Sequence, residues 1–165
     1  MANPTMTLIG TPVIVGSGGL TTVNFTSIPN TYTDLIIKAS ARAGSANWIN
    51  ISINGGSTTT NLLHLLDYNG TIYSQTYTPA RLTVNGTTSN TFSNSELYFT
   101  NYTSSNNKSF SADNSAEANS TNVELQIGAY SWNSTSPITS ITLTGDSGQT
   151  IEQYSTFYLY GIRNS

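Results

Sequence analysis

Apolar residues recur at every second position of this sequence, in short runs that turn residues separate. The pattern is clear in the segments 48–53, 123–130, 140–144 and 157–160. Successive side chains of a β-strand point to opposite faces of a sheet, so each run predicts a strand with one buried face. The chain is therefore expected to form antiparallel sheets with one face on a core.

Turn residues agree with this interpretation. Asn54-Gly55, Asn69-Gly70 and Asn85-Gly86 predict tight hairpin turns, because both central residues of such a turn take a positive φ. Helical periodicity is almost absent, and the abundant Thr, Ser and Asn disfavour helix interiors. Strands are expected near residues 6–15, 20–28, 34–41, 47–53, 61–66, 71–77, 81–84, 96–102, 121–132, 138–144 and 154–162. The leucines of 61–66 would fit one helical turn equally well.

The length of 165 residues predicts one domain. Many short strands with regular turns predict an all-β fold, a single-domain antiparallel β-sandwich that is jelly-roll-like. We expect an N-terminal arm over residues 1–8 and the sandwich over 9–165. Within it, the segment 103–120 is rich in Ser, Asn and Ala and has little apolar content beyond Phe110. It is therefore expected to be an excursion loop or a short edge hairpin.

Composition excludes several classes of function. Charged residues make up 8% of the chain, the net charge is −3, and the five Lys and Arg are scattered. A nucleic-acid partner is not expected, because phosphate binding needs clustered basic side chains. No run approaches 18 apolar residues and the N-terminus lacks a basic start, so we expect neither a membrane span nor a signal peptide. Synthesis in a cytoplasm follows from this expectation.

Catalytic and metal sites are not expected either. The chain has no cysteine. His64 lies in a leucine run with Asp67 three residues later, and that spacing does not build a catalytic triad. No pair among the eight acidic residues stands out as catalytic. The segment 67–70 begins like a calcium loop, but its glycine comes too early and no Glu follows at the required position. We therefore expect no catalytic residue, no cofactor and no metal.

Aromatic residues are the remaining resource for binding, since the chain holds ten Tyr and two Trp. In the segment 123–130 the alternation places Val123, Leu125 and Ile127 on the buried side. Outward aromatic side chains could contact another protein, be covered by the chain itself or stack on sugar rings. Oligomer formation is expected from such a surface. The candidate protein-interface residues on outward faces are Trp48, Tyr130, Trp132, Tyr158 and Tyr160.

Two segments carry a resemblance to a known group of proteins. Residues 27–37 read SIPNTYTDLII, and residues 137–143 (PITSITL) lead to residues 154–162 (YSTFYLYGI). Together they resemble small β-rich virion proteins of tailed bacteriophages, notably cyanophages and other aquatic phages. The resemblance covers the first and last quarters of the chain, and residues from about 55 to 120 are unmatched. No binding residue is carried over from it.

The resemblance implies a capsid decoration (cement) protein. Such a protein is non-enzymatic, is commonly a homotrimer and binds the major capsid protein on the outer surface of the virion. It would stabilise the shell by binding its assembled state. The segments 1–8 and 103–120 are the expected partner-reaching elements.

Two other functions stay open at this point. The first is a tail-fibre or receptor-binding module, or a carbohydrate-binding β-sandwich, with Trp48, Trp132 and the tyrosines as platforms for glycans. The second is a glycan-degrading enzyme, which would need two essential carboxylates. The same fold could carry any of these functions.

Overall fold

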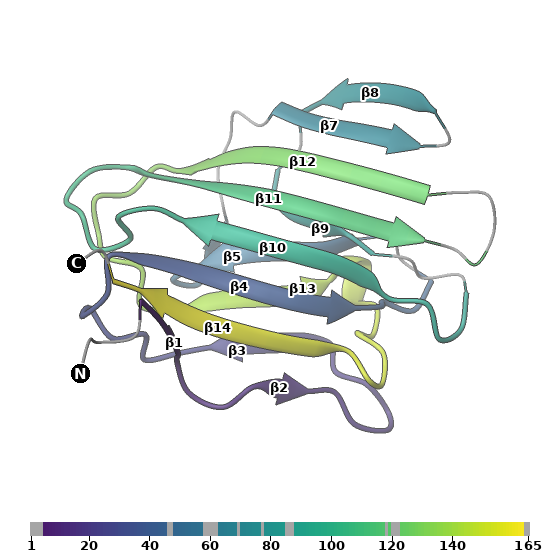
Figure 1. The fold of residues 1–165 in the computed structure, drawn as a ribbon, viewed down its shortest axis with the longest axis horizontal. Coiled ribbons are helices and arrows are strands. Elements are labelled where there is room, and N and C mark those ends of the chain that lie inside the picture. The colour runs from purple at the N-terminus through teal and green to yellow at the C-terminus, as the bar shows by residue number, and fades with distance from the viewer. Residues whose placement is uncertain are drawn as a thin grey trace.

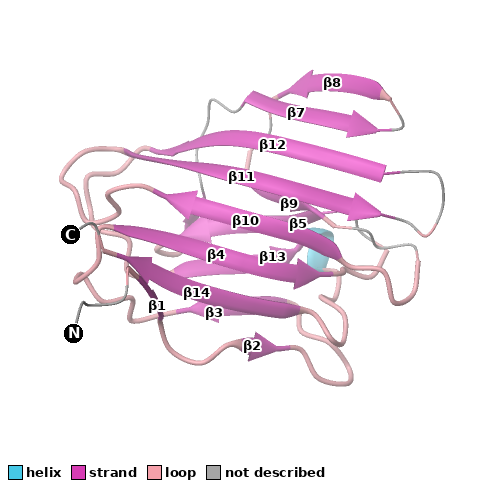
Figure 2. Ribbon diagram, viewed as in Figure 1, coloured by secondary structure: helices cyan, strands magenta, loops and turns pink. Residues whose placement is uncertain are grey.

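Two antiparallel sheets face each other across an apolar core (Figure 1). The computed structural model describes residues 5–45, 48–57, 63–68, 70–76, 78–84, 88–117, 119 and 123–163. Over these residues the chain is a β-sandwich, as the alternation predicts. Figure 2 shows how little helix accompanies the strands, with a single 3₁₀ turn, η1 (Asp146–Gly148), in the described part.

The larger sheet runs in the order β1-β14-β4-β10-β11-β12-β7-β8, and β2 also pairs with β14. The smaller sheet runs β3-β13-β5-β6, and β9 pairs with β5 beside β6. The strands of the larger sheet are β1 (Met6–Leu8), β2 (Val13–Ile14), β4 (Asp34–Ala41), β7 (Leu63–Tyr68), β8 (Thr71–Gln75), β10 (Ser93–Phe99), β11 (Lys108–Glu117), β12 (Val123–Trp132) and β14 (Thr156–Ile162). Those of the smaller sheet are β3 (Thr22–Phe25), β5 (Trp48–Ile53), β6 (Gly56–Ser57), β9 (Arg81–Thr83) and β13 (Ile141–Gly145).

Part of the strand order matches that of a jelly roll. When β1, β2, β14, β6 and the hairpin β10–β11 are set aside, the remaining strands run β4-β12-β7-β8 and β3-β13-β5-β9, which is how a jelly roll orders its two four-stranded sheets. The hairpin β10–β11 lies between β4 and β12 and widens the larger sheet. The β-sandwich is established by these pairings, whereas the jelly-roll assignment for the whole domain stays a prediction.

The expectation of an excursion loop or a short edge hairpin over 103–120 was wrong for residues 108–117. Residues 108–117 form β11, which pairs with β10 on one side and with β12 on the other. Its inward positions alternate strictly with exposed ones, and they include Phe110, Ala112 and Asn114. Because most of these buried side chains are small or polar, the segment lacks the apolar signal of an interior strand.

The expectation of an N-terminal arm over residues 1–8 was wrong for residues 6–8. Residues 6–8 form β1 and pair with the end of β14, with Met6 opposite Ile162. Residues 1–4 lie outside the described part of the chain. The edge of β14 offers unpaired backbone groups, and β1 satisfies them.

The core fills the space between the two sheets. Phe99, Phe110 and Tyr130 occupy neighbouring positions on β10, β11 and β12 and stack in a line. Their ring centroids are 4.7 Å apart for Phe99 and Phe110, and 4.9 Å apart for Phe110 and Tyr130. Gly128 leaves room for this line, because a Cβ there would lie 2.5 Å from a ring carbon of Tyr130. The stack therefore joins the inserted hairpin to β12.

We expect Tyr130→Phe to test the one polar group of this stack. The hydroxyl donates to the carbonyl of Arg81 at 2.9 Å, and burial raises the pKa of Tyr130 to about 12 from 10.0. Loss of that hydrogen bond should cost about 1 kcal/mol of unfolding free energy at neutral pH. A raised pKa means that the folded state holds the phenol proton more tightly, so wild type loses stability as pH rises from 10 to about 12.

Urea denaturation of both proteins at about pH 8 and about pH 11 provides the measurement. The variant lacks the titrating phenol, so its stability deficit should shrink at the higher pH. An equal deficit at both pH values would contradict the assigned environment of Tyr130.

Candidate functional site

The outer face of the larger sheet carries the groups that can bind another molecule. Its side chains come from every second residue of β14, β4, β10, β11 and β12, and the register aligns them in rows across the strands. One such row runs from Tyr158 through Lys38, Glu96 and Asp113 to Ile127. Polar and charged groups occupy the middle of the row, and apolar ones lie on β12.

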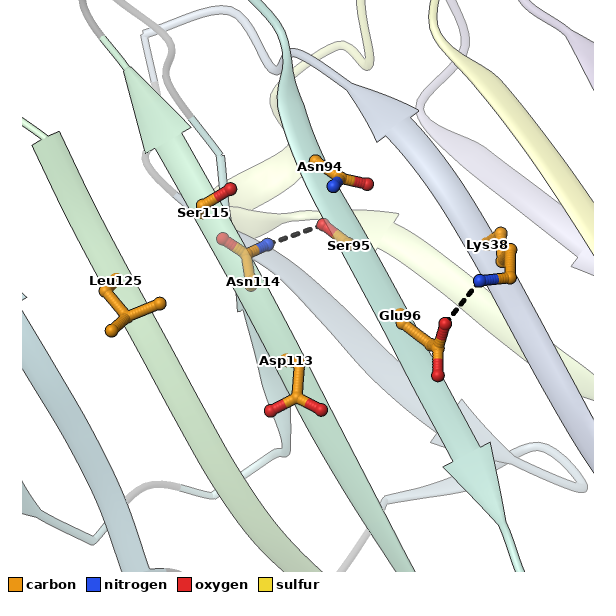
Figure 3. Close-up of a pocket in the computed structure, with 8 residues that line it drawn as sticks. All are labelled: Lys38, Asn94, Ser95, Glu96, Asp113, Asn114, Ser115 and Leu125. Atoms are coloured by element: carbon orange, nitrogen blue, oxygen red, sulfur yellow. Dashed lines mark hydrogen bonds and ion pairs between the residues drawn. The ribbon is translucent and has the colours of Figure 1, made fainter.

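A groove of about 330 Å³ lies in this face between β4 and β12 (Figure 3). Lys38 and Glu96 form an ion pair, with Nζ 2.5 Å from Oε2. Glu96 lies directly opposite Asp113 across the β10–β11 pair. Asp113 is exposed, and no described residue makes an ion pair or hydrogen bond with its carboxylate. The residues that line the groove are Lys38, Asn94, Ser95, Glu96, Asp113, Asn114, Ser115 and Leu125.

An apolar row borders the groove. It consists of Val123, Leu125 and Ile127 of β12, with exposed fractions of 54%, 48% and 49%. Ile72 of β8 is 73% exposed. It shares this face because Leu125 and Ile72 both pair in register with position 67 of β7, which lies between them. The side with β7 and β8 extends beyond the smaller sheet (Figure 1). Apolar side chains gathered in one place on a surface are typical of a binding interface.

The outward position of this row corrects the sequence-based expectation for β12. The alternation was recognised, but the opposite face is buried: Gln126, Tyr130 and Trp132 point inward, and Val123, Leu125 and Ile127 point outward. The cause lies in the smaller sheet, where β9 is the edge strand that lies under β11 and β12. Its free backbone groups need hydrogen-bond partners from the larger sheet.

Two buried amide side chains supply these partners. Gln126 accepts from the backbone N–H of Thr83 at 2.6 Å and donates to the carbonyl of Arg81 at 2.8 Å. Asn114 donates to the carbonyl of Thr83 at 2.6 Å and to Ser95 Oγ at 2.5 Å. A flipped β12 would put Leu125 or Ile127 against these backbone groups and leave them unsatisfied. The amide contacts therefore keep the apolar row on the outside.

Of the five aromatic residues expected on outward faces, three are there. Tyr158 and Tyr160 are half-buried on the outer face of β14, with ring centroids 6.4 Å apart and planes 16° apart. Trp48 lies on the outer side of the smaller sheet, under the guanidinium of Arg81 at 3.8 Å. Tyr130 and Trp132 are 4% and 8% exposed, so the prediction of their outward orientation was wrong. The five do not form one surface.

The groove and the apolar row were missed by sequence reasoning. Lys38, Glu96 and Asp113 come from three segments, and only the pairing of β4, β10 and β11 brings them together. The apolar row gave a clear signal, but alternation alone does not tell which face is buried. The polar residues opposite it, Gln126 above all, were the available hint that the inner face makes hydrogen bonds.

Lys108 is a charged residue that is buried and hydrogen-bonded within the fold. It is 2% exposed, and its Nζ donates to the carbonyls of Ser134 and Ser136 at 3.1 and 2.7 Å. Burial lowers the pKa of this amine. Lys108 therefore holds the 133–136 connection in place and offers no charge to a ligand.

Chemistry-bearing clusters are sparse in the described part of the chain. No three of its His, Asp and Glu residues gather as a metal site would require. None of its helices has the length and apolar character needed to cross a membrane. The side chain of His64 lies outside the described residues. No protein-family model, curated protein or solved structure matches this chain.

Gln126→Met should test the contacts that orient β12. Met matches the size of Gln but leaves the N–H of Thr83 without an acceptor, so the unfolding free energy should fall by about 1–3 kcal/mol. Asn94→Met, a matched change at an exposed position of β10, should stay within about 0.5 kcal/mol of wild type. Chemical denaturation followed by tryptophan fluorescence provides both values. Equal small effects would show that Gln126 does not secure the strand.

Proposed function

We propose that this chain is a non-enzymatic capsid decoration (cement) protein of a tailed bacteriophage. It would bind the outer surface of the virion shell and stabilise contacts between subunits of the major capsid protein. The observation that carries the proposal is the apolar row on the outer face of the larger sheet. The resemblance of residues 27–37 and 137–162 to small phage virion proteins supplies the identity of the partner.

The energetics of the apolar row suit a docking role. Val123, Leu125 and Ile127 each keep about half of their surface in water, so covering them would contribute about 1 kcal/mol each. That amount is small for one contact. In a homotrimer, which is part of this proposal, three such faces could engage neighbouring capsomers together, and their contributions would combine as avidity. Binding to the assembled shell alone would stabilise the shell by mass action, without any reaction.

Carbohydrate binding is the second candidate. The groove offers hydrogen-bond donors and acceptors, and Tyr158 lies in register with Lys38 at one side of it. The half-buried rings of Tyr158 and Tyr160 could stack on sugar rings. Trp132, one of the platforms considered from the sequence, is buried, so its replacement would test folding instead. Loss of glycan-array binding in Tyr158→Ala would favour this function.

The copy number of the chain in purified particles separates the two candidates. Quantitative mass spectrometry should give about one copy per major capsid subunit, or a simple fraction of that value, for a protein that covers the shell. A ratio of about a few hundredths would place the chain on the tail and favour glycan recognition. Absence from the particles would contradict both virion assignments.

The triple variant Val123→Thr, Leu125→Thr and Ile127→Thr tests the docking face directly. Thr keeps the β-branched shape that strands favour while it removes apolar surface, so the fold should persist. Affinity for shells stripped of this chain should fall by about a hundredfold, in a co-sedimentation assay. Ile14→Thr on β2, where Ile14 is 68% exposed, is the matched control and should bind normally. Unchanged binding by the triple variant would mean that another surface docks.

A further inference from the structure

The groove beside the apolar row carries a surplus negative charge. Lys38 neutralises Glu96, but Asp113 faces Glu96 across the strands and has no cationic partner among the described residues. Like charges in directly opposite positions of a sheet repel each other. While the face is in water, solvent screens this repulsion. A molecule that covers the face would remove the screening.

Docking on the apolar row necessarily brings Asp113 under the partner. Asp113 lies directly opposite Ile127 across the β11–β12 pair, and Leu125 belongs to both the row and the groove. A carboxylate that loses its water without gaining a counter-charge costs several kcal/mol. That penalty would exceed what the three apolar side chains contribute. A positive group on the partner would offset this cost most fully, because it supplies both a counter-charge and hydrogen-bond donors.

We propose that the groove receives a lysine or arginine side chain of a partner protein. This inference rests on the proposed docking function and names the chemistry of the surface that docks. The cationic head lies between the carboxylates of Asp113 and Glu96, and the methylene stem packs on Leu125. The side chains of Asn94 and Ser115 offer oxygen acceptors for the remaining N–H groups.

A second copy of this chain is a poor source of that cation. The chain has five Lys and Arg side chains, and four are committed elsewhere. Lys38 pairs with Glu96, and Arg42 Nη2 lies 3.5 Å from Glu152 Oε2. The guanidinium of Arg81 lies over the ring of Trp48, and Lys108 is buried. Arg163 is exposed, although it lies 5.2 Å over the ring of Tyr32. The partner is therefore a different protein that presents a basic side chain among apolar ones.

Nuclear magnetic resonance with defined peptides tests the groove without the partner. The probes are acetyl-Leu-Arg-Leu-amide and its citrulline counterpart, which has the same shape without the charge. The arginine peptide should shift the backbone amides of 94–96, 113–115 and 125, and its affinity should exceed that of the citrulline peptide by about fivefold. Asp113→Asn should abolish the difference between the peptides. Asp146→Asn, a matched change beside the smaller sheet, should preserve it.

Several outcomes of this titration would overturn the proposal. They are equal affinity for the two peptides, no shift at the groove, or an unchanged preference in Asp113→Asn. A shift of the same amides by a neutral oligosaccharide, with none by the arginine peptide, would assign the groove to sugars. Self-association of the free protein that both Asp113→Asn and Arg163→Gln weaken would assign it to a second copy.

Co-sedimentation with stripped shells connects the groove to the proposed function. Wild-type binding should weaken as salt rises from about 0.1 M to about 1 M, and Asp113→Lys should reduce affinity more than Asp113→Asn. Binding that neither salt nor the Asp113 variants change would overturn the basic-side-chain inference and leave the decoration function in place. No binding of wild type to the shells would overturn the decoration function, whereas the peptide titration would still decide the chemistry of the groove.

Discussion

The fold depends on how the free edge of β9 is satisfied. This short strand pairs with β5 on one side, and on the other its backbone groups meet Gln126 and Asn114 of the larger sheet. Unpaired backbone groups in a core are costly, so these amide contacts fix how β11 and β12 lie over the smaller sheet. They act as a polar joint between two layers that otherwise meet through apolar side chains. The aromatic stack of Phe99, Phe110 and Tyr130 continues the same inner surface.

The inward position of Gln126 also determines what lies on the outer face of β12. Because a strand alternates its side chains, the inward position of Gln126 makes Leu125 and Ile127 outward residues. The hydrogen bonds on the inner face of β12 thus determine that its apolar side chains lie on the outer face. A protein that kept this strand only for its own stability would gain from burying the apolar side. The arrangement found here leaves three apolar side chains half exposed to water, as is typical of a binding interface.

Sequence patterns predicted the sandwich, most strand positions and the half-exposed tyrosines of β14. They failed where the usual link between polarity and exposure is reversed. In β11, Ala112 and Asn114 are buried, so the strand resembles a loop in composition, and in β12 the apolar positions are the exposed ones. Period-2 alternation separates two faces but does not say which one is inside. The groove could not be predicted at all, because its charged residues meet only through long-range strand pairing.

The hairpin β10–β11 supplies both carboxylates of the groove, and it lies between β4 and β12 in the larger sheet. Its inward side chains belong to the core, whereas Glu96 and Asp113 touch only the surface. The groove and the core therefore use alternate residues of the same two strands. Substitutions at the outward positions would change the chemistry of the groove, whereas the inward positions maintain the packing between the two sheets. Because the two sets of side chains point to opposite faces, the surface of this hairpin can change while the scaffold stays the same.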